Sequence, residues 1–310
     1  MAALLRVSAP AKINLCLEVL GQRADGYHEI RTIMQAVSLF DELSFSVRSD
    51  GRIVLHASGA GLPAPKDNLV VQAARLLKEE CGCAKGADIE LVKNIPVGGG
   101  LGGGSSDCAE TLCALGDLWD LGLSSEHLAG LAARLGSDVP FFISGGTALC
   151  EGRGERVSAL HAEGTFHYVL VMPPERISTG QAYAAVEGSL TTSRRAGRIE
   201  DVQAALATMD ARRLGAALYN DLEVAAFRLN PRVRCVHQTF VLACPRVECL
   251  GLSLSGSGSS LFGVFDSHER ARKAAVQLAG ELEVPTLAVH SVPRRQEHCQ
   301  RLPGSEDNRP

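Results

Sequence analysis

The sequence has no surplus of positive charge and no long apolar run. Its 310 residues carry 31 Lys and Arg against 35 Asp and Glu, a formal net charge of -4. A protein with this balance has no excess of positive charge that would attract nucleic acid or an anionic membrane surface. Charged residues or glycines interrupt every apolar stretch well before the roughly 18 residues that a membrane-spanning helix needs. We therefore expect no nucleic-acid partner and no membrane partner, and local groups must hold any bound anion.

The ten cysteines form no CxxC pattern. Close pairs such as Cys81/Cys83 and Cys244/Cys249 lack the spacing of a zinc or redox motif. The first residues show no basic, apolar and small-residue signal pattern. Because free thiols without such a signal are typical of a reducing compartment, the expected location is the cytoplasm.

The composition is that of an ordinary globular protein, with 45% hydrophobic and 21% charged residues. It argues against the disordered and fibrous classes, and at about 150 residues per domain the length indicates two domains. A change in composition near residues 152–155 predicts an amino-terminal domain of residues 1–155 and a carboxy-terminal domain of residues 156–293. The polar, turn-rich residues 294–310 are predicted to form a disordered tail.

Hydrophobic periodicity predicts the main elements. Between residues 11 and 19, apolar side chains alternate with more polar positions that include Lys12 and Asn14, the pattern of a half-buried strand. Lys12 and Asn14 therefore share one face. Elsewhere the patterns predict helices at 68–81, 107–119, 125–135, 201–217 and 267–281, and strands at 33–47, 87–93, 157–172, 250–254 and 261–265.

A glycine-rich segment joins the predicted strand at 87–93 to the predicted helix at 107–119. Six of the seven residues from 98 to 104 are glycine, and two serines follow. Glycine lets consecutive backbone N–H groups face an anion, and a helix start adds unpaired N–H groups and the positive end of its dipole. A flexible surface turn is the alternative, but it rarely joins a strand to a helix. The pattern predicts a phosphate-binding loop made of Pro96, Val97, Gly98, Gly99, Gly100, Leu101, Gly102, Gly103, Gly104, Ser105 and Ser106.

Other nucleotide-binding motifs do not fit this loop. Gly98, Gly100 and Gly103 match GxGxxG literally, but the acidic residue expected about 20 positions later falls within a helical stretch. No lysine follows the glycines, as a P-loop requires, and the HRD and DFG motifs of protein kinases are absent. A cation for the phosphate must come from elsewhere in the chain.

Three segments in order resemble the motifs of the GHMP small-molecule kinases. They are Pro-Ala-Lys-Ile-Asn-Leu at 10–15, the glycine-rich loop at 96–106, and Leu-Ser-Gly-Ser-Gly at 254–258. The resemblance covers about residues 6 to 292. It implies a two-domain α/β (α+β) fold, with an amino-terminal domain like domain 2 of ribosomal protein S5 and a ferredoxin-like carboxy-terminal domain.

Within this family, Asp-Gly-Tyr-His at 25–28 and Ser-Asp-Val-Pro-Phe-Phe at 137–142 are similar to members whose small-molecule substrate carries a cytidine diphosphate group. The resemblance implies ATP as co-substrate, accompanied by Mg²⁺, and a catalytic pair formed by Lys12 and Asp138. Asp138 would take the proton of the attacking hydroxyl, and Lys12 would stabilise charge. General chemistry agrees, because phosphoryl transfer needs a positioned base and cations.

Each member of the pair also has a simpler interpretation. Asp138 could be a helix cap, since Pro140 stands where a helix is expected to start. Lys12 alone would be a solvated lysine on a strand. The neighbouring Pro-Ala and Asn14 favour the functional interpretation.

The resemblance also implies a set of substrate-binding residues. His28 would bind a base edge, and an aromatic ring would stack on cytosine. A turn histidine and a core tyrosine are the alternatives for His28 and Tyr183, and a plain hairpin turn is the alternative for 255–260. The set is Asn14, Tyr27, His28, Thr179, Tyr183, Gly256 and Gly258.

Two other functions stay open. A family member acting on homoserine or mevalonate is disfavoured by the segment at 25–28. A non-catalytic ATP-binding regulator is disfavoured because Lys12 and Asp138 are both present. The sequence is compatible with a monomer or a homodimer, and it identifies no metal ligand.

Overall fold

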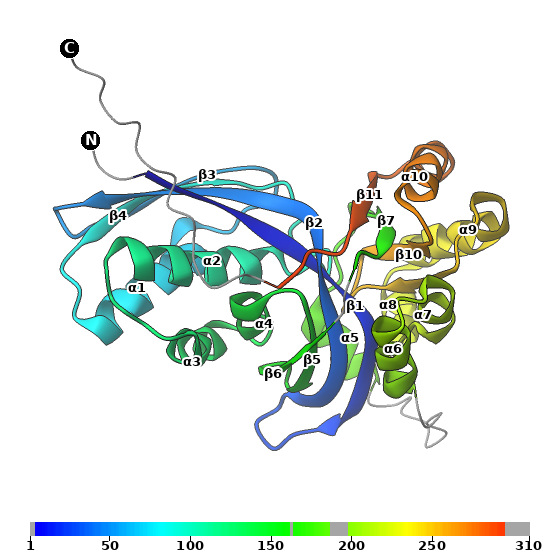
Figure 1. Ribbon diagram of the computed structural model, residues 1–310, viewed down its shortest axis with the longest axis horizontal. Helices are drawn as coiled ribbons and strands as arrows, with labels where there is room; N and C mark the ends of the chain where they lie inside the picture. The colour runs from blue at the N-terminus through cyan, green and yellow to red at the C-terminus, as the bar shows by residue number, and fades with distance from the viewer. Residues whose placement is uncertain (1–3, 162–163, 187–197, 295–310) are drawn as a thin grey trace, which may run out of the picture.

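The computed structural model describes residues 4–161, 164–186 and 198–294. The predicted tail at 294–310 lies outside these residues except for Arg294. The described chain forms two lobes that meet along two long strands, β1 (Leu4–Gln22) and β2 (His28–Arg48), which run through the middle of Figure 1. The described cysteines are all free. None of the described helices is long and apolar enough to cross a membrane.

The amino-terminal lobe is a mixed sheet with helices packed on it. Its described strands run in the order β3-β4-β2-β1-β8, and β5 pairs with β2 while β6 pairs with β5. The remaining strands are β3 (Ile53–Ser58), β4 (Gly86–Val92), β5 (Thr147–Gly152), β6 (Arg156–Leu160) and β8 (Tyr219–Asn220). The helices are η1 (Pro65–Asp67), α1 (Leu69–Cys81), α2 (Gly103–Leu118), α3 (Ser125–Leu135) and α4 (Val139–Ser144).

The carboxy-terminal lobe is an antiparallel sheet with helices around it. Its strands lie in the order β11-β7-β10-β9. They are β7 (His167–Val171), β9 (Gly251–Leu254), β10 (Leu261–Phe265) and β11 (Thr286–His290). The helices are α5 (Thr179–Val186), α6 (Arg198–Ala207), α7 (Ala211–Ala217), α8 (Glu223–Leu229), α9 (Pro231–Val247) and α10 (His268–Leu282). The predicted two-domain α/β (α+β) architecture is confirmed.

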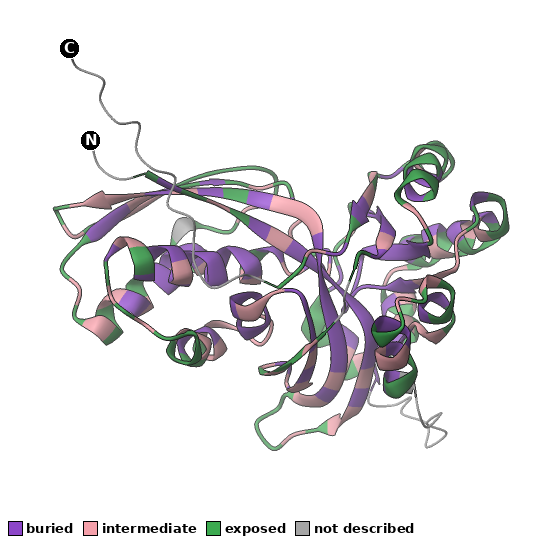
Figure 2. Ribbon diagram, viewed as in Figure 1, coloured by how far each residue is buried: buried purple, intermediate pink, exposed green. Residues whose placement is uncertain are grey.

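A shared apolar core joins the two lobes. Ile13 and Leu15 of β1 pack in one cluster with Tyr168 and Phe262 of the carboxy-terminal sheet. Figure 2 shows buried residues along the middle of β1 and β2. The alternation predicted for this strand is present, but the expectation of a half-buried strand was wrong. Residues 11–17 are all buried, because the glycine-rich loop and α4 cover the polar face that carries Lys12.

Two further differences concern segment ends. The predicted boundary between residues 155 and 156 falls inside the β5–β6 hairpin of the first sheet, so we propose a division after Leu160.

The single helix predicted at 201–217 is two helices. The chain turns at Met209, which has a left-handed φ of 53°, and the side chain of Asp210 caps α7 by accepting from the N–H of Arg213 at 2.9 Å.

Candidate active site

The three sequence motifs meet through backbone contacts. The N–H of Lys12 donates to the carbonyl of Leu101 at 2.9 Å, and the N–H of Ser260 donates to the carbonyl of Gly99 at 3.0 Å. The hydroxyl of Ser255 donates to the carbonyl of Gly100 at 2.9 Å. A Cβ on Gly100 would lie 2.2 Å from the carbonyl oxygen of Ser255, so only glycine fits there. The phosphate loop and the turn between β9 and β10 are therefore one assembly.

The assembled loop lines a cleft of about 780 Å³ between the lobes. Helix α2 begins at Gly103, four residues before the predicted start at Asp107, so its first N–H groups belong to the loop itself. Within the predicted loop, residues 96–105 line the cleft, and Ser106 is buried behind them. This arrangement is suited to an anion, because unpaired N–H groups and the positive end of the helix dipole face the same space.

Lys12 is held deep in this cleft and is only 3% exposed. Its Nζ lies 3.5 Å from Oδ2 of Asp138 and donates to Oδ1 of Asn14 at 2.6 Å. The amide of Asn14 in turn donates to Thr32 at 2.9 Å. This chain of contacts orients the ammonium group, and it excludes the alternative of a solvated strand lysine.

Asp138 occupies the cap position of α4, but its side chain makes no capping hydrogen bond. The carboxylate lies instead beside Lys12. Pro140 stands at the start of α4, as the sequence predicted. Asp138 thus stands at a helix start, and its carboxylate faces the cleft.

All the predicted acceptor-binding residues except Gly258 line the same cleft. The three rings among them, on the β1–β2 hairpin and on α5, form its other half. Tyr27 is 50% exposed at the tip of the β1–β2 hairpin. The ring of His28 stacks on Tyr183 of α5, with centroids 5.0 Å apart and planes 27° apart. Burial, together with the charge of Asp138, raises the pKa of Tyr183, so its phenol stays neutral.

The turn between β9 and β10, which carries the motif at 254–258, lies between these two halves of the cleft. Thr179 and Ser257 share a hydroxyl hydrogen bond of 3.0 Å. A Cβ on Gly256 would lie 3.2 Å from Nζ of Lys12, whereas Gly258 packs against Leu254 and does not reach the cleft. The turn therefore approaches Lys12 closely at Gly256.

Sequence reasoning missed a buried charge cluster beneath the loop. Lys93 hydrogen-bonds to Asp41 and also donates to Oδ2 of Asp107 at 2.8 Å. Asp41 accepts further from the N–H groups of Asn94 and Ile95. Burial raises the pKa of Asp107 to about 7, since the attraction of Lys93 only partly offsets desolvation and Asp41 adds repulsion.

Lys93 and Asp107 both line the cleft. They flank the glycine-rich loop in the sequence, which was a signal for them, but the cation expected from elsewhere in the chain was assigned to Lys12 alone. Within the described residues, no three His, Cys, Asp or Glu side chains form a metal-binding group.

Comparison with known proteins places this geometry in a family. The model of the GHMP kinases N terminal domain matches residues 68–146, and that of the GHMP kinases C terminal domain matches residues 202–283. The 4-diphosphocytidyl-2-C-methyl-D-erythritol kinase of Pelotomaculum thermopropionicum is 43% identical over 272 residues, 87% of this chain and 92% of that protein. The enzyme of the same name from Shouchella clausii is 40% identical, over 88% and 90% of the two chains.

Solved structures agree. A crystal structure of 4-(cytidine 5'-diphospho)-2C-methyl-D-erythritol kinase is 35% identical, with a TM-score of 0.75 over 93% of this chain and 99% of that one. A homoserine kinase from Cytophaga hutchinsonii has a TM-score of 0.76 over 96% of each chain, but at 21% identity it shows the fold alone.

Proposed function

This chain belongs to the GHMP kinase family and, within it, to the 4-diphosphocytidyl-2-C-methyl-D-erythritol kinases, and from this premise we propose its reaction. It transfers the γ-phosphate of ATP to the 2-hydroxyl of 4-diphosphocytidyl-2-C-methyl-D-erythritol, giving the 2-phosphate and ADP. This is a step in the non-mevalonate route to isoprenoid precursors. The observation that carries the proposal is the pair of buried Lys12 and partly exposed Asp138 beside a glycine-rich loop at a helix start.

In this reaction the loop holds the phosphates of ATP through backbone N–H groups and the start of α2. Asp138 accepts the proton of the 2-hydroxyl as the new O–P bond forms and the bond to ADP breaks. Lys12 balances the charge of the carboxylate and stabilises the negative charge on the phosphoryl oxygens. The proposed reaction is a direct transfer that forms no phosphorylated enzyme.

Mg²⁺ belongs to the proposal as the ion that accompanies ATP. Oxygen donors near the loop fit it, because Oδ1 of Asp107 is buried without a hydrogen-bond partner among the described residues, and the hydroxyl of Ser105 is near the same helix start. When bound, the ion would offset part of the phosphate charge.

For the acceptor, we assign the cytidine diphosphate group to the outer half of the cleft. Tyr27 and Tyr183 provide rings for the base, and His28 provides a polar ring edge. Thr179 and Gly256 lie where they can approach the phosphates of this group. A cytoplasmic enzyme fits this reaction, and whether it acts as a monomer or a homodimer stays a prediction.

The decisive experiment measures ATP turnover by the purified protein with four acceptor conditions. They are 4-diphosphocytidyl-2-C-methyl-D-erythritol, homoserine, mevalonate and no acceptor. We expect turnover with the cytidylyl substrate alone, and a loss of about 100-fold or more in kcat for Asp138→Asn, the usual range for a general base. Turnover with homoserine or mevalonate instead would mean that the protein is a kinase, but that the proposed substrate is wrong. Nucleotide binding without turnover under any condition would favour a regulator.

A further inference from the structure

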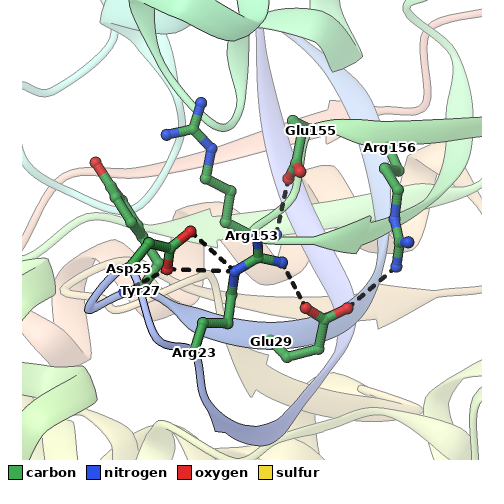
Figure 3. A network of polar contacts seen from close by, with 7 residues as sticks. All are labelled: Arg23, Asp25, Tyr27, Glu29, Arg153, Glu155 and Arg156. Carbon is green, nitrogen blue, oxygen red and sulfur yellow. Dashed lines mark hydrogen bonds and ion pairs between the residues drawn. The ribbon is translucent and has the colours of Figure 1, made fainter.

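One short turn, between β5 and β6, contacts both the acceptor hairpin and the catalytic segment. Arg153 in this turn lies beside the Tyr27 ring, with its guanidinium carbon 5.0 Å from the ring centroid (Figure 3). The next residue, Gly154, packs on the other side: a Cβ there would lie 3.5 Å from the carbonyl oxygen of Ser137 and 3.7 Å from Oδ1 of Asp138. The turn therefore connects the hairpin tip with the segment of the catalytic base.

The Arg153 side chain is anchored independently of Tyr27. It donates from NH2 to the carbonyl of Ala133 at 2.5 Å. Ala133 is in the last turn of α3, where the negative end of the helix dipole favours a cation. The backbone N–H of Arg153 donates to Glu155 at 2.7 Å (Figure 3). The nearby carboxylate of Glu29 forms ion pairs with Arg23 and Arg156. The guanidinium is thus held in a defined position beside the ring.

The backbone of Tyr27 is fixed within the hairpin, but its ring is half exposed. The N–H of Tyr27 donates to Asp25 at 3.1 Å, and the carbonyl of Tyr27 accepts from the N–H of Arg23 at 2.7 Å. These contacts determine where the chain turns. They leave the ring orientation to side-chain contacts, among which the guanidinium supplies a cation–π interaction.

We propose that Arg153 is a positioning residue for Tyr27. It holds the ring at the mouth of the cleft in the orientation that stacks on the cytosine base, so that less freedom is lost when the acceptor binds. This inference rests on the proposed function, because it takes Tyr27 as part of the cytidine site. Arg153 acts through Tyr27, and the Gly154 contact keeps the same turn packed against the segment of Asp138.

The first test is a pair of substitutions with steady-state kinetics. Arg153→Met keeps the aliphatic stem and removes the charge and the donor, whereas Arg153→Gln keeps a shorter polar side chain with an amide donor and removes the charge. We expect both to raise the KM for the cytidylyl substrate by about three- to fivefold, the size of a cation–π contact at a partly exposed site. The KM for ATP and kcat should stay unchanged. A wild-type KM in a folded Gln variant would overturn the proposal.

A double-mutant cycle separates positioning from direct contact. In a Tyr27→Ala background, Arg153→Met should cause no further rise in the KM for the cytidylyl substrate, because the ring it supports is gone. An equal rise in both backgrounds would mean that Arg153 contacts the substrate itself, and the proposal would fail.

Arg156→Met is the matched control. Arg156 lies at the start of β6 and pairs with Glu29 at 3.1 Å. Its loss should change the KM by less than about 1.5-fold, since the cation–π contact at Tyr27 is left intact. A rise equal to that of Arg153→Met would assign the effect to the charge network of the hairpin and contradict the proposal.

The two proposals fail in different ways. If the wild-type protein does not turn over the cytidylyl substrate, the proposed function is wrong before Arg153 is tested. If the wild-type protein turns it over and neither Arg153 variant changes its KM, only the role of Arg153 is refuted.

Discussion

The two halves of the cleft are built from different parts of the chain. The nucleotide half is mainly backbone: the loop at 98–104 is hydrogen-bonded to the turn after β9 and stands above the buried side chain of Lys93. The acceptor half is mainly side chains, carried by a projecting hairpin and by α5. Tyr27 is half exposed there, and His28 stacks on Tyr183.

This difference determines what each half tolerates. A backbone site depends on the absence of side chains, so any Cβ in the loop that meets a neighbouring backbone atom should displace the site. A site made of rings depends on their shape and orientation, and truncation of one ring should weaken binding of one substrate only. Glycine substitution in the loop and ring truncation in the acceptor half test this contrast.

The largest effect is expected for Gly100→Ala. The added Cβ would lie 2.2 Å from the carbonyl oxygen of Ser255, and Gly100 has a φ of +78°, which L-residues rarely adopt. The loop must shift, and a shift of about 1 Å in a phosphoryl-transfer site costs on the order of 100-fold in kcat/KM. ATP-dependent turnover and thermal unfolding measure the result.

Gly130→Ala is the control for this change. Gly130 is an exposed residue inside α3 with no atom near its Cβ position. Alanine should stabilise the protein by about 0.5–1 kcal/mol and leave turnover unchanged. Comparable activity in the two alanine variants would refute the close packing of the motifs.

The contrast also explains what could be predicted from the sequence. The turn between β4 and α2 follows from its glycines, because a run of residues without side chains has a direct physical meaning. Its binding of phosphate stays a prediction. The alternation from 11 to 19 correctly placed Lys12 and Asn14 on one face. The two-domain fold followed from motifs in the right order.

Features that depend on tertiary contacts could not be predicted from local pattern. The cluster around Lys93 exists only because β2 brings Asp41 beside the loop. The ring pair of His28 and Tyr183 joins segments about 150 residues apart in the sequence. For the acceptor half, residue types alone favoured a turn histidine and a core tyrosine, and only the family resemblance indicated a substrate site.

An intermediate effect is expected for Tyr183→Ala. Loss of a ring that stacks on a base costs about 1–3 kcal/mol, so the KM for the cytidylyl substrate should rise about tenfold. The KM for ATP should not change. Tyr183→Phe keeps the ring and should behave like the wild-type protein; an equal loss in both variants would point to the hydroxyl instead of stacking.

The last effect concerns stability in the nucleotide half, and no loss of turnover is needed to detect it. Burial raises the pKa of Asp107 to about 7 in the folded protein, against about 4 in an unfolded chain. Between these values the folded state keeps a proton that the unfolded state releases. The free energy of unfolding should therefore fall as pH rises from about 4 to about 7. Asp107→Asn should remove this fall and be more stable at pH 8 by at least about 1.4 kcal/mol, the value of one pKa unit.

Denaturant unfolding from pH 4 to pH 8 measures this difference, and Asp50→Asn provides a control. The side chain of Arg48 lowers the pKa of Asp50, so the stability that this exposed carboxylate adds is lost only as pH falls below its unfolded pKa of about 4. Between pH 4 and pH 8 the Asp50→Asn variant should therefore keep the pH slope of the wild-type protein. An unchanged pH slope in Asp107→Asn would mean that the buried cluster is fully compensated by Lys93. The buried charges of the nucleotide half would then not lower the free energy of unfolding, and this half would differ from the acceptor half in its backbone alone.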